Sequence, residues 1–243
     1  MIGDYNWGNK SKGEMNVFSK MKFAYDVILL RYEYKKQKKV NFDYNQKDLN
    51  IPDSALIKQT IEFLKDTHQV YLINHCFRTY LFGYSIGRNE NIKFDLEIFT
   101  IASLLHDVGL TSQHQLNNKN CNCFAVEGAI EAGNFLEKQN IEKDKIKTIQ
   151  DVIALHLNIK IPINLPEAYL LNKGASVDVI GRNLNSFNPE FLTKTLETYP
   201  RLNFKTEIDK VLTTQCNIRP NSRIAFLYEN GFNTLIQKSD FDE

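Results

Sequence analysis

Four residues of this 243-residue chain have side chains that could together bind a divalent metal: His75, His106, Asp107 and Asp178. Each lies in a segment rich in aliphatic and aromatic residues, where burying an imidazole or a carboxylate costs free energy unless a partner compensates it. Two imidazoles and two carboxylates suit Zn²⁺, Fe²⁺ or Mn²⁺. The alternative is a separate structural role for each residue, as a core histidine, a helix-end aspartate or half of a salt bridge. Because that alternative needs four coincidences, the sequence favours one metal site.

The segments that carry these residues have the apolar spacing and end signals of helices. Residues 68–86 contain His75, and residues 166–182 contain Asp178. Asp95 can cap a third helix, which ends after the His-Asp pair. Further helices are expected at about residues 16–37, 53–67, 124–138, 142–157, 189–198, 203–216 and 221–230. No segment has strong strand character, so the expected fold class is all-α, a compact helical bundle.

The chain length is that of a single domain. We expect residues 51–205 to form its metal-binding core. Residues 1–50 are expected to supply an N-terminal arm and a helix that pack on this core, and residues 206–243 a C-terminal helical extension of the same domain.

The composition indicates which partners to expect. Thirty basic and 29 acidic residues leave a net charge of +1, which predicts neither a nucleic-acid nor a membrane partner. The N-terminus lacks the apolar region of a signal peptide, and the apolar run at residues 98–105 is too short to span a bilayer. The four cysteines show no disulfide framework, which fits a reducing compartment. These features predict a cytoplasmic protein that acts on a small molecule.

The order His75, then His106-Asp107, then Asp178 resembles the HD superfamily of metal-dependent hydrolases. This resemblance implies that the four residues are the ligands of one divalent metal. The expected role of the metal is to lower the pKa of a bound water to about 7, so that hydroxide is present at neutral pH.

Six ordered segments extend the resemblance to the cyanamide hydratase branch of the superfamily: LINHCFRTYLFGYSIG, ASLLHDVGLT, CFAVEGAIEAGNFL, IQDVIALHLN, LNKGASVDVIG and ETYPRLNF. The resemblance implies a zinc-dependent lyase that adds water across a C≡N bond, and it implies self-association. Besides Asp107, the expected catalytic residues are His156 and Thr111, which would protonate or orient the developing anion. A small, mostly apolar pocket bounded by His75, Phe82, Thr111 and His156 would suit such a substrate.

One position departs from that branch and keeps two alternatives open. The branch has Phe-Glu where this chain has Phe124 followed by Ala125. The first alternative is an HD phosphohydrolase acting on a nucleotide or phosphomonoester, with Arg78, Lys119 or Arg182 gripping the phosphate. The second is a catalytically degenerate HD protein that binds a ligand without turnover.

Overall fold

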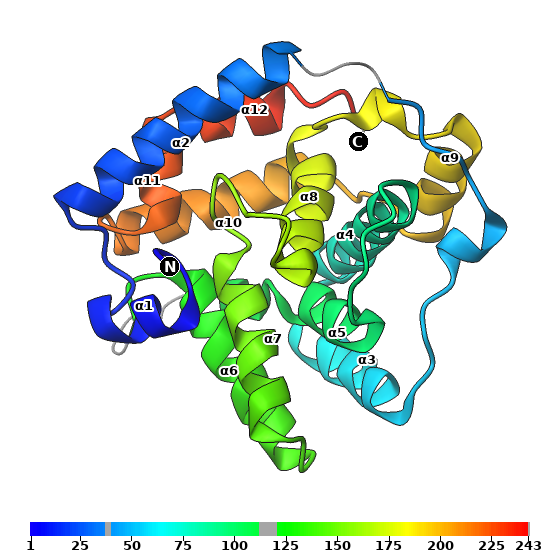
Figure 1. The fold of residues 1–243 in the computed structure, drawn as a ribbon, viewed down its shortest axis with the longest axis horizontal. Coiled ribbons are helices and arrows are strands. Elements are labelled where there is room, and N and C mark those ends of the chain that lie inside the picture. The colour runs from blue at the N-terminus through cyan, green and yellow to red at the C-terminus, as the bar shows by residue number, and fades with distance from the viewer. Residues whose placement is uncertain (37–39, 112–120, 243) are drawn as a thin grey trace.

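The computed structural model describes residues 1–36, 40–111 and 121–242, and these residues form helices and connections with no strand. The predicted all-α fold is therefore confirmed for the described part of the chain (Figure 1). The helices are α1 (Tyr5–Ser11), α2 (Val17–Lys36), α3 (Ala55–Thr67), α4 (Val70–Asn89), α5 (Leu96–Leu105), α6 (Phe124–Lys138), α7 (Lys143–Leu155), α8 (Pro166–Ile180), α9 (Pro189–Thr198), α10 (Phe204–Ile218), α11 (Arg223–Glu229) and α12 (Phe232–Gln237), with 3₁₀ turns η1 (Gln46–Leu49), η2 (Val108–Leu110) and η3 (Leu184–Ser186).

Local signals explain where several of these helices begin. The side chains of Ser54 and Asp95 accept hydrogen bonds from the backbone N–H groups of Ile57 and Ile98, at the starts of α3 and α5. Pro166 and Pro189 occupy the first helical position of α8 and α9, where a missing N–H costs nothing. These caps are local in sequence, and they lie at or within two residues of the predicted starts.

Two short helices and one helix end differ from the sequence-based expectation. Helices α1 and α12 were not expected, and α12 lies in the segment expected to be a polar tail. Helix α4 was expected to stop at Gly87 but continues to Asn89. Gly87 is an interior position of close packing, since a Cβ there would lie 2.8 Å from the ring of Phe94. None of the described helices combines the length and the apolar composition that crossing a membrane requires.

Helices α4 and α8 pack closely at the centre of the molecule, and a glycine sets their register. A Cβ on Gly174 of α8 would lie 2.1 Å from the carbonyl oxygen of Thr79 on α4, so only glycine allows this approach. One turn away on each helix, this antiparallel contact brings His75 of α4 opposite Asp178 of α8. The close glycine contact therefore determines which polar residues meet between these two helices.

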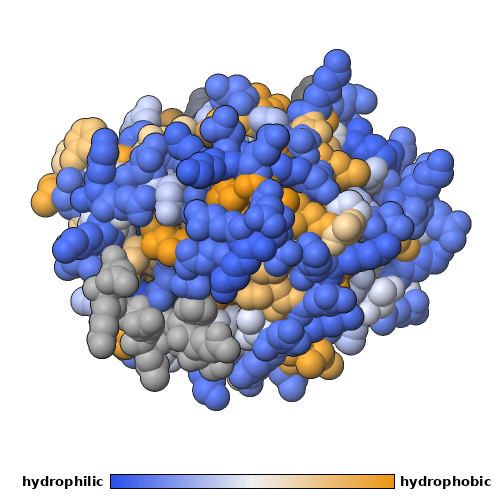
Figure 2. Space-filling view, turned by 90° about the horizontal axis from the view of Figure 1, so that it is seen from below, coloured by the Kyte–Doolittle hydropathy of each residue, from blue (hydrophilic) through white to orange (hydrophobic). Residues whose placement is uncertain are grey.

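The N-terminal and C-terminal helices lie together on one side of this centre. Figure 1 shows α2 running alongside α11 and α12, with α10 crossing beneath them. Phe23 of α2 packs edge-on against Phe226 of α11, with ring centroids 6.1 Å apart. In Figure 2 the face seen from below is mainly hydrophilic, with hydrophobic residues in patches between the charged ones. Segments more than 180 residues apart in the sequence thus form one wall of the molecule.

Candidate metal centre

Three side chains with metal-ligating atoms meet in the interior, from the middle of α4 and the end of α5. The Nε2 atoms of His75 and His106 lie 3.1 Å apart, and each lies 3.3 Å from Oδ2 of Asp107. All three residues are buried. His106 is the C-cap of α5 and Asp107 has left the helix, with φ −106° and ψ 12°. Because the helix ends between them, two adjacent side chains reach the same point.

The chain turns sharply after this pair, at the 3₁₀ turn η2. A Cβ on Gly109 would lie 2.1 Å from the carbonyl oxygen of Phe124, so glycine permits the start of α6 to approach the turn. Phe124 then lies beside the cluster and lines the cavity described below.

The second nitrogen of each histidine ring fixes the orientation of the first. The Nδ1 atom of His75 lies 2.7 Å from Oδ2 of Asp178, and that of His106 lies 2.9 Å from the carbonyl oxygen of Ser103. Because a carbonyl or an ionised carboxylate only accepts, Nδ1 is assigned as the donor in both rings. In its neutral form, which is the form that binds a metal, each imidazole then presents the lone pair of Nε2 toward Asp107.

The spacing of these three atoms fits one divalent ion. With ligand bonds of about 2.0–2.2 Å, two ligand atoms on a tetrahedral or octahedral ion lie about 2.8–3.6 Å apart. The three separations, 3.1, 3.3 and 3.3 Å, fall within this range. Two facing imidazole lone pairs and a carboxylate repel one another unless a cation or protons lie between them. The donor set is thus suited to hold an ion such as Zn²⁺, and its geometry does not select the metal.

Asp178 lies on the other side of the His75 ring, at Nδ1. Its oxygens accept from Nε and Nη2 of Arg78 at 2.7 and 2.8 Å, and from Nη1 of Arg201 at 3.1 Å. Burial alone would raise the pKa of Asp178, but Arg78, His75 and Arg201 hold it below its usual range. This carboxylate is therefore an anion that holds the His75 ring and two buried guanidinium groups.

The ionisable groups of the cluster shift one another's pKa values. Burial alone would raise the pKa of Asp107, but His106 and His75 beside it hold that pKa well below its usual range. Burial alone would lower the pKa of His106, but the charge of Asp107 outweighs it and raises the pKa to about 10. Protons thus compete with a metal for the same nitrogen atoms, and metal binding releases them.

His156, the C-cap of α7, lies next to this cluster and differs from its histidines in protonation. Its Nδ1 donates to the carbonyl oxygen of Ile153 at 2.7 Å, and its Nε2 lies 3.7 Å from Oδ1 of Asp107. Burial, and then the positive charge of His106, lower the pKa of His156 to about 3. His156 is therefore a neutral imidazole at pH 7. Asn172 supports it by donating to its backbone carbonyl oxygen at 2.8 Å.

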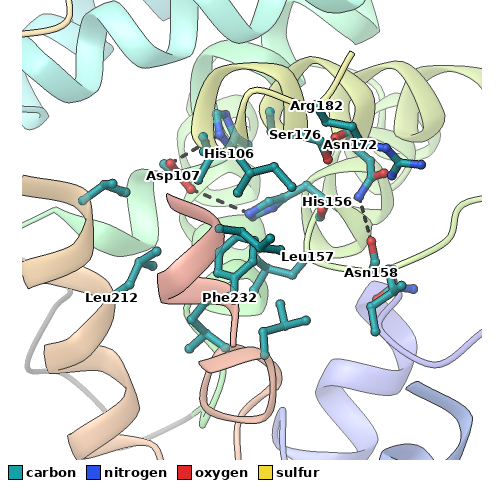
Figure 3. Close-up of a pocket in the computed structure, with 18 of the residues that line it drawn as sticks. His106, Asp107, His156, Leu157, Asn158, Asn172, Ser176, Arg182, Leu212 and Phe232 are labelled. Atoms are coloured by element: carbon teal, nitrogen blue, oxygen red, sulfur yellow. Dashed lines mark hydrogen bonds and ion pairs between the residues drawn. The ribbon is translucent and has the colours of Figure 1, made fainter. Parts of the chain in front are cut away.

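A cavity of about 220 Å³ opens from this cluster (Figure 3). His75, His106, Asp107 and His156 line one end of it. The remaining lining is mainly aliphatic and aromatic, and most of it comes from helices α2, α8, α10, α11 and α12. The arrangement provides a reactive polar end and an apolar body in one cavity that is partly open to solvent.

Other residues expected at the site lie elsewhere. Thr111 is buried, but its hydroxyl donates to the carbonyl oxygen of Val108 at 2.9 Å and it does not line the cavity. Phe82 is fully buried in an aromatic cluster, with its ring centroid 5.2 Å from that of Phe187. Lys119 lies outside the described residues.

The pairing of a second arginine, Arg201, with Asp178 was not predicted from the sequence. Arg201 lies in the last of the six family-like segments, ETYPRLNF, but nothing in that segment indicates which carboxylate it pairs with. Its guanidinium also lies over the rings of Phe204 and Phe241, 5.0 and 4.2 Å from their centroids. Phe204 in turn stacks on His75, with centroids 4.7 Å apart.

Comparison with known protein families agrees with this geometry. Residues 72–178 match the HD domain, a segment that begins in α4 and ends at Asp178. It contains His75, His106, Asp107 and His156. A comparison with curated proteins found no match to this chain. The convergence of the metal-ligating residues lies within the segment that matches the HD domain, and HD domains are typically metal-dependent hydrolases.

Proposed function

We propose that this protein is a metal-dependent enzyme that adds water to a small neutral molecule with an electrophilic carbon, such as a C≡N group. One observation carries the proposal: the Nε2 atoms of His75 and His106 and a carboxylate oxygen of Asp107 converge at the end of an apolar cavity. In this proposal those three residues hold the metal. Asp178, expected from the sequence to be a fourth ligand, instead positions His75 through Nδ1.

In this proposal each group has a role in the reaction. A divalent ion held by His75, His106 and Asp107 would supply Lewis-acid chemistry, lowering the pKa of water to about 7. His156, neutral and at 3.7 Å from Asp107, accepts a proton from water as the water oxygen forms its bond to the nitrile carbon. The same imidazolium then returns that proton to the nitrile nitrogen, and a shift of the second proton from oxygen to nitrogen gives the amide. Asp107 stays ionised throughout and helps to hold the positive charge that forms on His156.

A phosphohydrolase is less well supported by the contacts. Phosphoryl transfer needs fixed cations around the equatorial oxygens. Arg78 is fully buried and bound to Asp178, so it does not face the cavity. Among the described residues, Arg182 is the one lysine or arginine that lines the cavity. A single guanidinium beside a mainly apolar wall suits a neutral substrate better than a nucleotide.

The position that departs from the cyanamide hydratase pattern also lies away from the cavity. Ala125 is fully buried in an apolar cluster with Phe124, Val126 and Leu110. A glutamate at this position would bury a carboxylate among the apolar side chains of that cluster. Burying an unpaired charge costs on the order of several kcal/mol. The centre formed by His75, His106 and Asp107 is complete without it, so the degenerate-protein alternative has no support from the ligand set.

The test combines metal content with turnover. The purified protein, loaded in turn with Zn²⁺, Fe²⁺ and Mn²⁺, is assayed against cyanamide, alkyl nitriles and phosphomonoesters. We expect one bound ion per chain and hydration of the C≡N compounds. His106→Ala should lose both, whereas His68→Ala, a buried histidine outside the cavity lining, should keep both. Phosphomonoester hydrolysis without C≡N turnover would contradict the proposal, as would stoichiometric metal in the His106→Ala protein.

A further inference from the structure

The cavity at the metal centre is larger than a molecule such as cyanamide requires. It measures about 220 Å³. An apolar cavity of about 150 Å³ is enough to hold benzene, so this one has room for roughly nine heavy atoms. A substrate with three heavy atoms would fill only the end next to His106 and Asp107. The volume therefore indicates a substrate with a body beyond its reacting group.

The far wall of the cavity is apolar and is built outside the HD domain. It is formed by Ile208 and Leu212 of α10, Ile224 and Leu227 of α11, and Phe232 of α12, all beyond residue 178. Figure 3 shows Leu212 and Phe232 below the His106–Asp107 pair, on the side of the cavity away from Asn172 and Ser176. Helix α2, which precedes the HD domain, adds Val27 and Leu30. The chain's own N-terminal and C-terminal helices thus decide the shape of this wall.

Several polar residues along the cavity are already engaged with the protein. The amide nitrogen of Asn172 donates to the carbonyl oxygens of His156 and Asn158, at 2.8 and 2.7 Å. The Ser176 hydroxyl donates to the carbonyl oxygen of Asn172, and the Asn230 amide donates to that of Phe226. These groups serve the fold rather than a ligand. The other polar side chains of the lining are Asn158, Arg182 and the four that converge at the metal-centre end, His75, His106, Asp107 and His156.

From this volume and this division of polarity, we infer that the natural substrate is an amphiphile. Its reacting group lies at His75, His106 and Asp107, and an unbranched or aromatic apolar body extends toward Leu212 and Phe232. The inference rests on the proposed function for the reacting group and adds the class of the body. Cyanamide would then be a minimal substrate that leaves the apolar part of the cavity unfilled.

Binding can test the inference without the reaction. Straight-chain alkyl nitriles of three to twelve carbons are titrated by calorimetry into the metal-free protein, where no turnover occurs. Each added methylene group that enters the cavity should tighten the dissociation constant about fourfold, the factor given by burial of one CH₂. The tightening should stop at about nine heavy atoms, where the cavity is full. A dissociation constant that ignores chain length, or one that falls steadily to twelve carbons, would overturn the inference.

Substitutions in the cavity wall should change the chain length at which the dissociation constant stops tightening, here called the break. Leu212→Trp fills the wall and should move the break to shorter chains, whereas Ile224→Ala opens space and should move it to longer ones. Thr213→Trp, at an exposed position next to Leu212 on α10, is the matched control and should leave the break where it is. Circular dichroism checks the fold of each variant, and Ile224→Ala serves if the larger side chain prevents folding. A break that stays fixed in both cavity variants would overturn the inference.

The inference and the proposed function can fail separately. Turnover of cyanamide by the metal-loaded enzyme together with chain-length-independent binding would overturn the amphiphile alone. A dissociation constant that tightens with chain length up to the break in the metal-free protein, with no turnover of any nitrile, would support the apolar cavity and overturn the proposed reaction.

Discussion

Replacement of Asp178 by asparagine tests how the buried anion supports the metal centre. The Asp178 carboxylate accepts from Arg78, Arg201 and Nδ1 of His75, and it is fully buried. An asparagine has one acceptor oxygen and an NH₂ group, which would face N–H donors. The substitution therefore leaves two buried guanidinium groups without their counter-charge and frees the His75 ring to change tautomer.

Two magnitudes follow from these contacts. Loss of one partner from a buried ion pair costs about 3–5 kcal/mol of unfolding free energy. Loss of the carboxylate that orients a metal-ligating histidine typically weakens metal binding about 10–100-fold, or about 1.4–2.7 kcal/mol. Asp107→Asn, which removes one of the three converging ligand atoms, should weaken metal binding more than Asp178→Asn does.

The assays are urea denaturation of the metal-free protein and competition for Zn²⁺ with a chelator of known affinity. Asp48→Asn is the matched control because Asp48 is also buried and paired with an arginine, Arg88, at 2.7 Å, and neither residue lines the metal-centre cavity. It should lower stability and leave the zinc affinity unchanged. Unchanged zinc affinity in Asp178→Asn would refute the positioning role. A loss equal to that of Asp107→Asn would show that Asp178 is itself a ligand.

Three further outcomes are expected. His156→Gln should reduce turnover at least tenfold, an order of magnitude set by general acid–base catalysis, and keep the bound metal; loss of the metal would make His156 a ligand instead. Gly174→Ala should destabilise the fold by about 1–3 kcal/mol, measured in urea, and weaken zinc binding, because the added Cβ would lie 2.1 Å from the Thr79 carbonyl oxygen and push α8 off α4. Burial raises the pKa of Glu127 from 4.5 to about 7 despite Arg219, so its contribution to stability is full below pH 4.5 and is lost as pH rises through about 7. The unfolding free energy of the native protein should therefore fall relative to that of Glu127→Gln between pH 5 and about 7.5, and parallel pH profiles would contradict this reasoning.

Most of the helices and the types of chemical group follow from short stretches of sequence. Apolar spacing and caps such as Asp95 and Pro189 are local, because a helix begins where side chains a few residues apart satisfy its first N–H groups. The adjacent His106-Asp107 pair also belongs to the local sequence. Most helix starts and the metal-ligating residue types could therefore be predicted without the fold, whereas α1 and the end of α4 could not. Nothing local indicated helix α12, whose residues read as a polar tail.

Which atoms meet depends on long-range packing. His75 and Asp178 are 103 positions apart, and their contact through Nδ1 depends on the register that Gly174 allows between α4 and α8. Periodicity shows the buried face of each helix but says nothing about how two faces slide against each other. The apolar cavity likewise depends on packing α2 beside α11 and α12, which is a sum of weak contacts between distant segments. The sequence thus specified the reactive groups, and long-range packing specified their partners and the space in front of them.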